Sequence, residues 1–253
     1  MVGRPGRRAV QKVLCQLRLA GAPDLVIANG ENAAAGFGIT PAVAAELFEA
    51  GVDVITMGNH AWSKRETYDL YRQEPRLLRP ANYPPQDPGR GDGVYTARDG
   101  TTVGVLNLQG RIYMEAIDCP FRVGQAAVEE LREQTPVIVV DMHAEATSEK
   151  MAIAYLLDGL VSAVVGTHTH VATTDARLLR GGTAYITDVG MTGPVESILG
   201  VQPELIIERF VNRMPNKFEI AGGPAVLQGV LIEVDPYSGR ATYIRRIEES
   251  SEE

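Results

Sequence analysis

The four histidines of this chain all lie in short polar motifs. His60 follows Asn59, His143 ends an Asp-Met-His triplet, and His168 and His170 form a His-Thr-His sequence. Imidazole is the commonest metal ligand in proteins, and near pH 7 it is neutral often enough to coordinate an ion. Because every imidazole lies in such a motif, the pattern favours metal-dependent chemistry.

A further motif offers oxygen donors, the Asn-Gly-Glu-Asn of residues 29–32. Each motif has a plainer explanation when it stands alone. A His-X-His pair can be a solvated loop, residues 29–32 and 58–60 are typical of turns, and a single histidine after an apolar strand is typical of a hydrogen-bonded core residue. The joint occurrence of the four motifs favours the metal site.

Strand and helix patterns alternate along most of the chain, which indicates an α/β fold with largely parallel strands. Thr40 is predicted to cap a helix that begins at Pro41, and residues 225–234 and 241–247 are predicted to form an antiparallel hairpin. Short apolar runs predict strands at residues 24–28, 52–57, 102–108, 136–142, 161–165 and 184–187, and apolar spacing predicts helices at 10–17, 42–50 and 148–157.

The four motifs occur where predicted strands end. Residues 29–32 follow the first strand, 58–60 follow the second, 141–143 end a third, and 166–170 follow a fourth. Ligands of open α/β sheets bind at the carboxyl ends of the strands. We therefore expect the four motifs to meet at one sheet edge.

Length and charge narrow the class of protein. A chain of 253 residues that is 45% hydrophobic can bury a large core, and we expect a single domain over residues 1–253. The net charge of −8 argues against non-specific nucleic-acid binding, which requires a basic surface. If the substrate carries phosphate, a metal must supply the positive charge.

The cysteine count and the absence of long apolar runs bear on the cellular compartment. Two cysteines are too few for a disulfide framework, so Cys15 and Cys119 are interpreted as reduced thiols. No apolar run approaches 18 residues, and the first residues lack the apolar core of a signal peptide. We expect a cytoplasmic protein without a membrane partner, and self-association stays open.

Three acidic residues are weaker candidates for a role in the site. Asp188 ends a strand, where it either hydrogen-bonds a histidine ligand or forms a turn. Glu145 and Glu149 lie on either side of a predicted helix cap at Thr147 or Ser148, and pairing with the helix dipole explains them adequately.

Five segments together resemble the YmdB-type bacterial branch of the calcineurin-like metallophosphoesterases: residues 29–38, 58–60, 141–150, 166–170 and 187–193. The resemblance covers nearly the whole chain. It implies an α/β sandwich of two mixed β-sheets flanked by helices, with two metal ions at the sheet edge. It also implies phosphodiesterase or phosphatase activity, with cyclic nucleotides among the substrates of the branch.

The resemblance implies six metal ligands and one catalytic histidine. His60 would stand near the leaving-group oxygen as a general acid or as a stabiliser of developing charge. Two metal ions roughly 3.5–4 Å apart can activate a hydroxide and hold the phosphate, and mixed nitrogen and oxygen ligation suits Mn, Fe or Zn. The implied ligands are a bridging Glu31, with Asn59, His143 and His168 in one site and Asn32 and His170 in the other.

The chain departs from the family pattern at its beginning. Family members start with an apolar strand that ends in Gly-Asp, followed by a loop that resembles residues 2–7, and here the chain starts at Met1. The absent aspartate would be a ligand of the site of Asn32 and His170. Either the reading frame continues upstream of Met1, or a real truncation has produced a protein that folds poorly or binds one metal weakly.

We expect the DNA directly upstream of the Met1 codon to encode the missing apolar strand that ends in Gly-Asp, in a segment of typical strand length. An in-frame stop codon directly before Met1 would contradict that expectation.

The motifs therefore predict a dinuclear metal-dependent phosphoesterase that uses a metal-activated hydroxide, and a phosphodiesterase acting on cyclic nucleotides in particular. One alternative is a phosphomonoesterase acting on nucleotides or small phosphoesters. The other is a metal-binding regulatory protein that does not turn substrate over.

Overall fold

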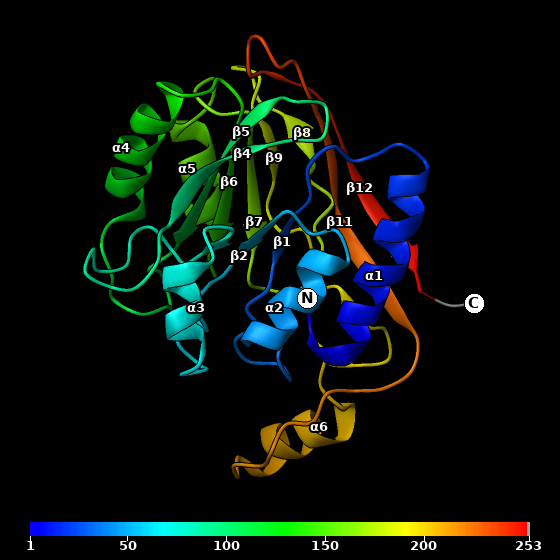
Figure 1. The fold of residues 1–253 in the computed structure, drawn as a ribbon. Helices are drawn as coiled ribbons and strands as arrows, with labels where there is room; N and C mark the ends of the chain where they lie inside the picture. The colour runs from blue at the N-terminus through cyan, green and yellow to red at the C-terminus, as the bar shows by residue number, and fades with distance from the viewer. Residues whose placement is uncertain (252–253) are drawn as a thin grey trace.

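A computed structural model describes residues 1–251 and shows a sandwich of β-sheets with helices on both outer sides (Figure 1). The elements in chain order are α1 (Gly3–Leu19), β1 (Ile27–Asn29), α2 (Pro41–Glu49), β2 (Val54–Thr56), α3 (Thr67–Gln73), β3 (Leu77–Leu78), β4 (Asp92–Thr96), β5 (Thr102–Gln109), α4 (Pro120–Arg132), β6 (Ile138–His143), α5 (Thr147–Leu156), β7 (Ala163–Thr167), β8 (Arg177–Leu178), β9 (Ala184–Ile186), β10 (Gly193–Pro194), α6 (Pro203–Asn212), β11 (Ala225–Val234) and β12 (Ala241–Ser250).

The larger sheet has six strands in the order β4-β5-β6-β7-β9-β8. The inner strands β5, β6, β7 and β9 are parallel, and β4 and β8 join antiparallel at the edges. Helices α4 and α5 cover one face, where Val128 and Ile153 pack against Leu106 and Leu108. This burial explains why the inner strands are continuous apolar runs rather than alternating ones.

The other layer consists of two three-stranded sheets. Strands β1, β2 and β3 form a parallel sheet, and β10, β11 and β12 form an antiparallel one. Helices α1 and α2 cover the parallel sheet through Val13 and Leu47, which pack with Ile55. On the inner side, Val54 packs in a cluster with Val105 of the six-stranded sheet. The predicted sandwich with flanking helices is therefore confirmed.

The two smaller sheets are not joined to each other within residues 1–251. Strand β1 pairs only with β2, and over residues 227–234 strand β11 pairs only with β12. A cavity of about 430 Å³ lies between them, lined by β1, by β11 and by apolar residues of α1, and it reaches Glu31 and His170. The mixed sheet that the resemblance implies for this layer is thus divided into a parallel and an antiparallel half.

Several expectations about single elements can be compared with the structure. The Thr40 cap is confirmed, because its Oγ1 accepts a hydrogen bond from the Val43 amide, and the hairpin of β11 and β12 is confirmed. The predicted cap at Thr147 or Ser148 is wrong. The helix α5 begins one position earlier, after Ala146, which has no capping side chain.

Residues 2–7 resemble the loop that follows the first strand in the family pattern. In the structure, the chain from Gly3 onward instead forms the first turns of α1. No helix within residues 1–251 is long and apolar enough to cross a membrane.

Candidate metal centre

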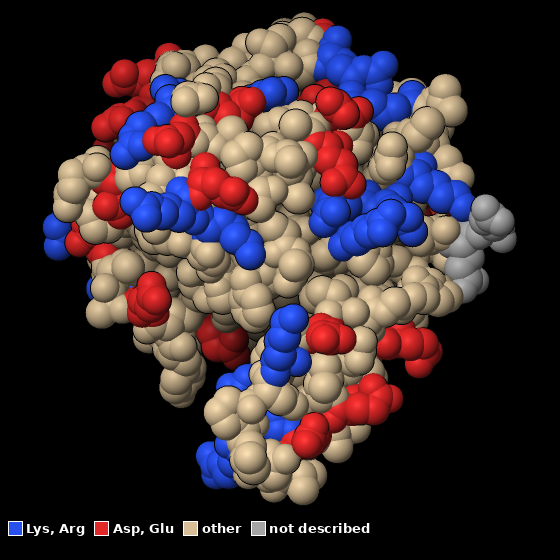
Figure 2. All heavy atoms as spheres, turned by 60° about the horizontal axis from the view of Figure 1, so that its bottom comes forward, with Lys and Arg blue, Asp and Glu red and all other residues tan. Residues whose placement is uncertain are grey.

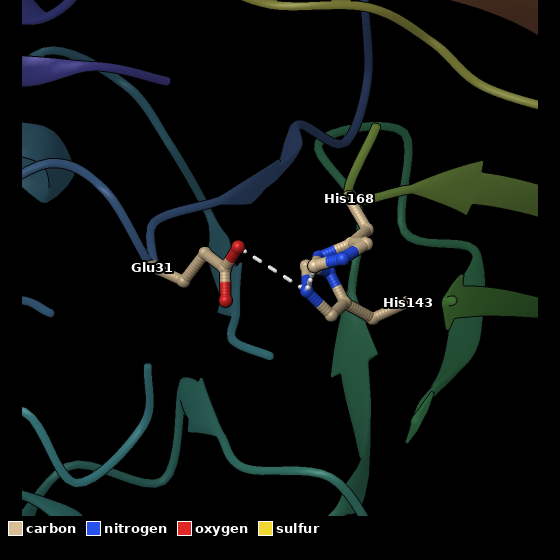
Figure 3. A group of neighbouring side chains, drawn as sticks. All are labelled: Glu31, His143 and His168. Atoms are coloured by element: carbon tan, nitrogen blue, oxygen red, sulfur yellow. Dashed lines mark hydrogen bonds and ion pairs between the residues drawn. The ribbon is translucent and has the colours of Figure 1, made fainter. Parts of the chain in front are cut away.

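The polar motifs meet where four strands end. Glu31 follows β1, Asn59 follows β2, His143 is the last residue of β6, and His168 follows β7. The ligating atoms of Glu31, His143 and His168 all lie within 4.8 Å of one another. In Figure 3 the carboxylate and the two imidazoles point toward a common centre.

The Nε2 atom of His143 lies at the middle of this group. It is 3.2 Å from Oε1 of Glu31, 3.0 Å from Oδ1 of Asn59 and 3.0 Å from Nδ1 of His168. His143 and Glu31 are both almost fully buried. The four side chains thus turn their polar atoms toward the same small space, with Asn59 and His168 on its partly exposed side.

The tautomer of His143 follows from its other nitrogen. The hydroxyl of Thr167 donates to Asp141, at 2.7 Å, so its hydrogen is not available to His143. The Nδ1 of His143 lies 2.9 Å from the same hydroxyl oxygen and must therefore be the donor. In the neutral ring, Nε2 then carries a lone pair that faces Glu31 and Asn59.

The tautomer of His168 follows in the same way. Its Nε2 lies 3.2 Å from a carboxylate oxygen of Glu145, which can only accept, so Nε2 carries the proton and Nδ1 carries the lone pair. Burial, together with the nearby His143, lowers the pKa of His168 to about 4. His168 is therefore neutral near pH 7 and able to bind a metal.

This arrangement fits a cation. Two imidazoles and the oxygens of Asn59 and Glu31 converge at hydrogen-bonding distance, and a bound cation would accept a lone pair from each of them. Burial alone would raise the pKa of Glu31, but the neighbouring His143 and His60 lower the pKa to about 2, so the carboxylate is ionised. This set of nitrogen and oxygen donors suits a divalent transition metal.

A second, smaller group consists of Asn32 and His170. The amide nitrogen of Asn32 donates to the Gly36 carbonyl, at 2.8 Å, and its Oδ1 lies 3.1 Å from Nε2 of His170. The Nδ1 of His170 is buried and has no hydrogen-bond partner within residues 1–251. Burial and the adjacent terminal ammonium of Met1 lower the pKa of His170 to about 4, so this imidazole is neutral as well.

His60 stands beside the first group without joining it. Its backbone N–H donates to Oε2 of Glu31, at 3.3 Å, while its ring contacts other residues. Nδ1 is 3.4 Å from the Ser63 hydroxyl, and the ring packs edge to face on Phe37 with centroids 5.0 Å apart. The imidazole is therefore held next to Glu31 by its backbone but is not one of the converging side chains.

A buried ion pair stabilises the loop that carries His168 and His170. His168 and His170 have positive φ angles of 105° and 64°, which are unfavourable for residues other than glycine. Thr169 between them donates to Asp188 through its amide, at 3.1 Å, and its hydroxyl, at 2.8 Å. Asp188 pairs with Lys150 at 2.8 Å, and both are fully buried. Asp188 therefore holds the two histidines through Thr169 and also bonds the Gly190 amide in its own turn.

Replacing Lys150 by methionine is expected to destabilise the metal-free protein by about 3 kcal/mol, because it leaves the Asp188 carboxylate buried without a counter-charge. Metal affinity should fall too, since the strained loop loses its support. Denaturant unfolding and metal titration measure the two effects, with the exposed Lys217→Met as the control. A Lys150→Met variant as stable as wild type would show that the pair does not hold this loop.

Sequence reasoning missed the roles of two acidic residues. Glu145 contacts the His168 ring, and Glu149 accepts hydrogen bonds from the Arg111 and Ile112 amides, at 3.0 and 3.3 Å, so it anchors the loop after β5. Their position near the start of α5 made helix-dipole pairing a sufficient explanation. The contacts that they actually make connect segments far apart in the sequence.

Comparisons with known proteins identify the family of this chain. Residues 1–247 match the family model described as YmdB-like protein. A Bacillus subtilis protein named 2′,3′-cyclic-nucleotide 2′-phosphodiesterase is 47% identical over 247 residues, which cover 98% of this chain and 93% of that protein.

Two solved structures are also similar. A Thermus thermophilus protein called hypothetical has a TM-score of 0.92 and 43% identity, covering 98% of this chain and 96% of its own. A Mycoplasma pneumoniae protein described as a novel phosphatase has a TM-score of 0.91 and 35% identity, covering 98% and 90%. The family match over nearly the whole length, together with these similarities, shows that the chain belongs to the YmdB-like family.

Proposed function

We propose that this protein is a metal-dependent phosphodiesterase that hydrolyses 2′,3′-cyclic nucleotides. The observation that carries the proposal is the converging donor set of Glu31, Asn59, His143 and His168. The substrate class comes from the Bacillus subtilis relative, whose name specifies it. The acidic chain has a net charge of −8, so it depends on bound cations to hold an anionic phosphate.

The proposed ligands fall into two groups that share Glu31, with divalent Mn, Fe or Zn as the bound ions. When bound, such a pair of ions supplies a hydroxide nucleophile near neutral pH and offsets the charge that develops on the phosphate. Asn59, His143 and His168 belong to one group with Glu31, and Asn32 and His170 belong to the other.

The residues of the chain supply orientation and a proton. Thr167 and Glu145 fix the ring nitrogens that His143 and His168 turn toward the centre. His60 lies beside Glu31 and is assigned the leaving-group side, where it donates a proton to the departing ribose oxygen. An alkoxide is a poor leaving group, so this proton lowers the barrier to cleavage.

The function is tested with purified protein, Mn²⁺, a 2′,3′-cyclic nucleotide and bis-p-nitrophenyl phosphate. We expect hydrolysis of both diesters, abolished by a chelator and restored by Mn²⁺. Glu31→Gln should lose activity, because the amide lacks the charge that the ions need, and the exposed Glu196→Gln should keep it. The absence of metal-dependent hydrolysis of either diester would reject the proposal.

The two ligand groups should differ in how well they retain metal. We expect the group of Glu31, Asn59, His143 and His168 to bind more tightly, because four converging donors surround it, whereas the other group adds only Asn32 and His170 to Glu31. Elemental analysis and anomalous scattering after dialysis measure both occupancies. Two fully occupied ions in this chain would contradict the expectation and require a ligand not assigned above.

A further inference from the structure

An exposed aromatic side chain lies directly beside His60. The Phe37 and His60 rings meet edge to face, with centroids 5.0 Å apart and an angle of 82° between their planes. Phe37 lies in the loop between β1 and α2, and it is 45% exposed to solvent. Since His60 covers only part of the Phe37 ring, the rest of the ring is open to a ligand bound next to His60.

The loop does not need Phe37 as an anchor. Its other apolar residues, Ala33, Ala34 and Ile39, are buried, and Ala33 and Ile39 belong to the core cluster beneath α1 and α2. A single exposed apolar side chain needs no explanation by itself. The argument therefore depends on where the loop holds the Phe37 ring.

The loop holds Phe37 at a fixed place relative to the proposed metal ligands. Ala35, Gly36 and Gly38 have positive φ angles of 57°, 93° and 72°, and such a value is unfavourable for alanine. Asn32 supports this conformation, because its side-chain amide donates to the Gly36 carbonyl, at 2.8 Å, and its own carbonyl accepts from the Gly36 amide, at 3.1 Å. Backbone strain of this kind is concentrated at functional sites, where the surrounding structure maintains it.

The same loop packs on the segment that follows His60. A Cβ added to Gly38 would lie 2.9 Å from Cγ of Lys64 and 3.2 Å from Cβ of Ser63, so the absence of a side chain lets the two segments approach closely. Phe37 and His60 thus belong to two packed loops, one after β1 and one after β2. Backbone packing, and not the ring contact alone, sets the distance between them.

The surroundings suit an uncharged group. The loop between β1 and α2 lies on the lower side of the main body in Figure 1, and this side comes forward in Figure 2. In Figure 2 uncharged surface separates the Lys and Arg side chains of the main body from the projecting lobe that carries α6. A nucleobase is uncharged near pH 7, so it is bound through stacking and apolar contacts rather than ion pairs.

The shape of a 2′,3′-cyclic nucleotide brings its base to this place. The cyclic phosphate bridges O2′ and O3′ of the ribose, and the base is attached to C1′, the neighbour of C2′. With His60 at the departing ribose oxygen, the base is only a few bonds away from the atom that His60 protonates. Phe37, in contact with the His60 ring, is then within reach of the base. Every base has a π face, so stacking on Phe37 accepts any of the four.

We infer that Phe37 binds the base of the substrate by stacking and thereby determines the preference for cyclic nucleotides over cyclic phosphodiesters that lack a base. The inference rests on the proposed function, in which His60 stands at the departing ribose oxygen. Phe37 takes no part in the chemical step, so its contribution belongs to binding and appears in KM.

Two substrates that differ only in the base test this inference. They are 2′,3′-cyclic AMP and methyl riboside 2,3-cyclic phosphate, which carries a methoxy group in place of adenine. With Mn²⁺, Phe37→Ala should raise KM for 2′,3′-cyclic AMP about 5- to 150-fold, the usual effect of removing a stacked aromatic side chain, with kcat little changed. KM for the methyl riboside should stay at the wild-type value, because this substrate has no base to stack. Phe37→Tyr keeps an aromatic ring and should retain the wild-type KM for both substrates.

The control is Tyr237→Ala, which removes an exposed aromatic side chain from the turn between β11 and β12. Gly239 of this turn lies against Pro136, just before β6 and therefore at the opposite end of that strand from His143. The control should leave KM unchanged for both substrates. Circular dichroism and metal analysis show whether Phe37→Ala is folded and retains the metal content of the wild type.

The outcomes separate this inference from the proposed function. An unchanged KM for 2′,3′-cyclic AMP in Phe37→Ala, or an equal rise in KM for both substrates, would overturn the inference alone. An equal loss of kcat on both substrates would also overturn it, because Phe37 would then act by positioning His60. A wild type that hydrolyses neither substrate would overturn the inference together with the proposed function.

Discussion

The variant His168→Ala is expected to lose metal and activity together. His168 supplies one of the two imidazole lone pairs that face the centre, and its Nδ1 is 3.0 Å from Nε2 of His143. Loss of a hydrogen-bond partner behind a metal ligand already costs about 10- to 100-fold in affinity, so loss of the ligand itself should cost at least about 100-fold. Elemental analysis after dialysis, with diesterase assays at rising Mn²⁺, measures both effects.

The variant Glu145→Gln is a milder change at the same ligand, and its metal affinity is compared with that of His168→Ala. It keeps His168 but replaces the carboxylate that fixes its protonated nitrogen, so metal affinity should fall less than in His168→Ala. Melting temperatures of the metal-free proteins separate metal loss from unfolding. If His168→Ala bound metal as tightly as wild type, the Glu31, His143 and His168 group would not be the metal site.

Much of the fold could be predicted because burial leaves a local trace in the sequence. Strand β5 was predicted within one residue of its observed end, since its run from Val103 to Leu108 is apolar enough for a strand buried on both faces. Helix α2 was predicted from Thr40 and Pro41, whose capping geometry is local. The first turns of α1 were not predicted, because Gly3, Pro5 and Gly6 are poor helix formers, and tertiary packing of Gly6 near Thr192 overrides propensity there.

The candidate site could be predicted only in part. The chain positions of Glu31, His143 and His168 follow from strands that end beside one another, and the structure brings these residues together. The supporting residues carry no comparable signal. Thr167 and Glu145 act on histidines through ring nitrogens whose direction depends on tertiary packing, and Lys150 reaches Asp188 from another segment. A spacing pattern contains no information about such contacts.

The variant His60→Ala is expected to keep the metal content of the wild type and lose about 10²- to 10⁴-fold in kcat, the usual effect of removing a positioned proton donor. The neighbouring Asn59 turns its oxygen toward His143, and the His60 amide binds Glu31, so the backbone is anchored at the centre while the ring lies outside the ligand group. Metal content and steady-state kinetics on a 2′,3′-cyclic nucleotide measure the two effects. The control Ser63→Ala removes the hydroxyl near Nδ1 but keeps the imidazole, so its loss should be small.

The leaving group decides whether His60 acts as an acid. A ribose alkoxide needs a proton as it departs, whereas p-nitrophenolate is stable without one, so the loss in His60→Ala should be much smaller for bis-p-nitrophenyl phosphate than for the cyclic nucleotide. A role limited to folding or to holding Phe37 would slow both substrates equally. Equal losses would therefore assign His60 a structural role, and loss of metal from His60→Ala would make it a ligand. Retained metal with a loss that depends on the leaving group is the combination that a role at the leaving oxygen produces and a structural role does not.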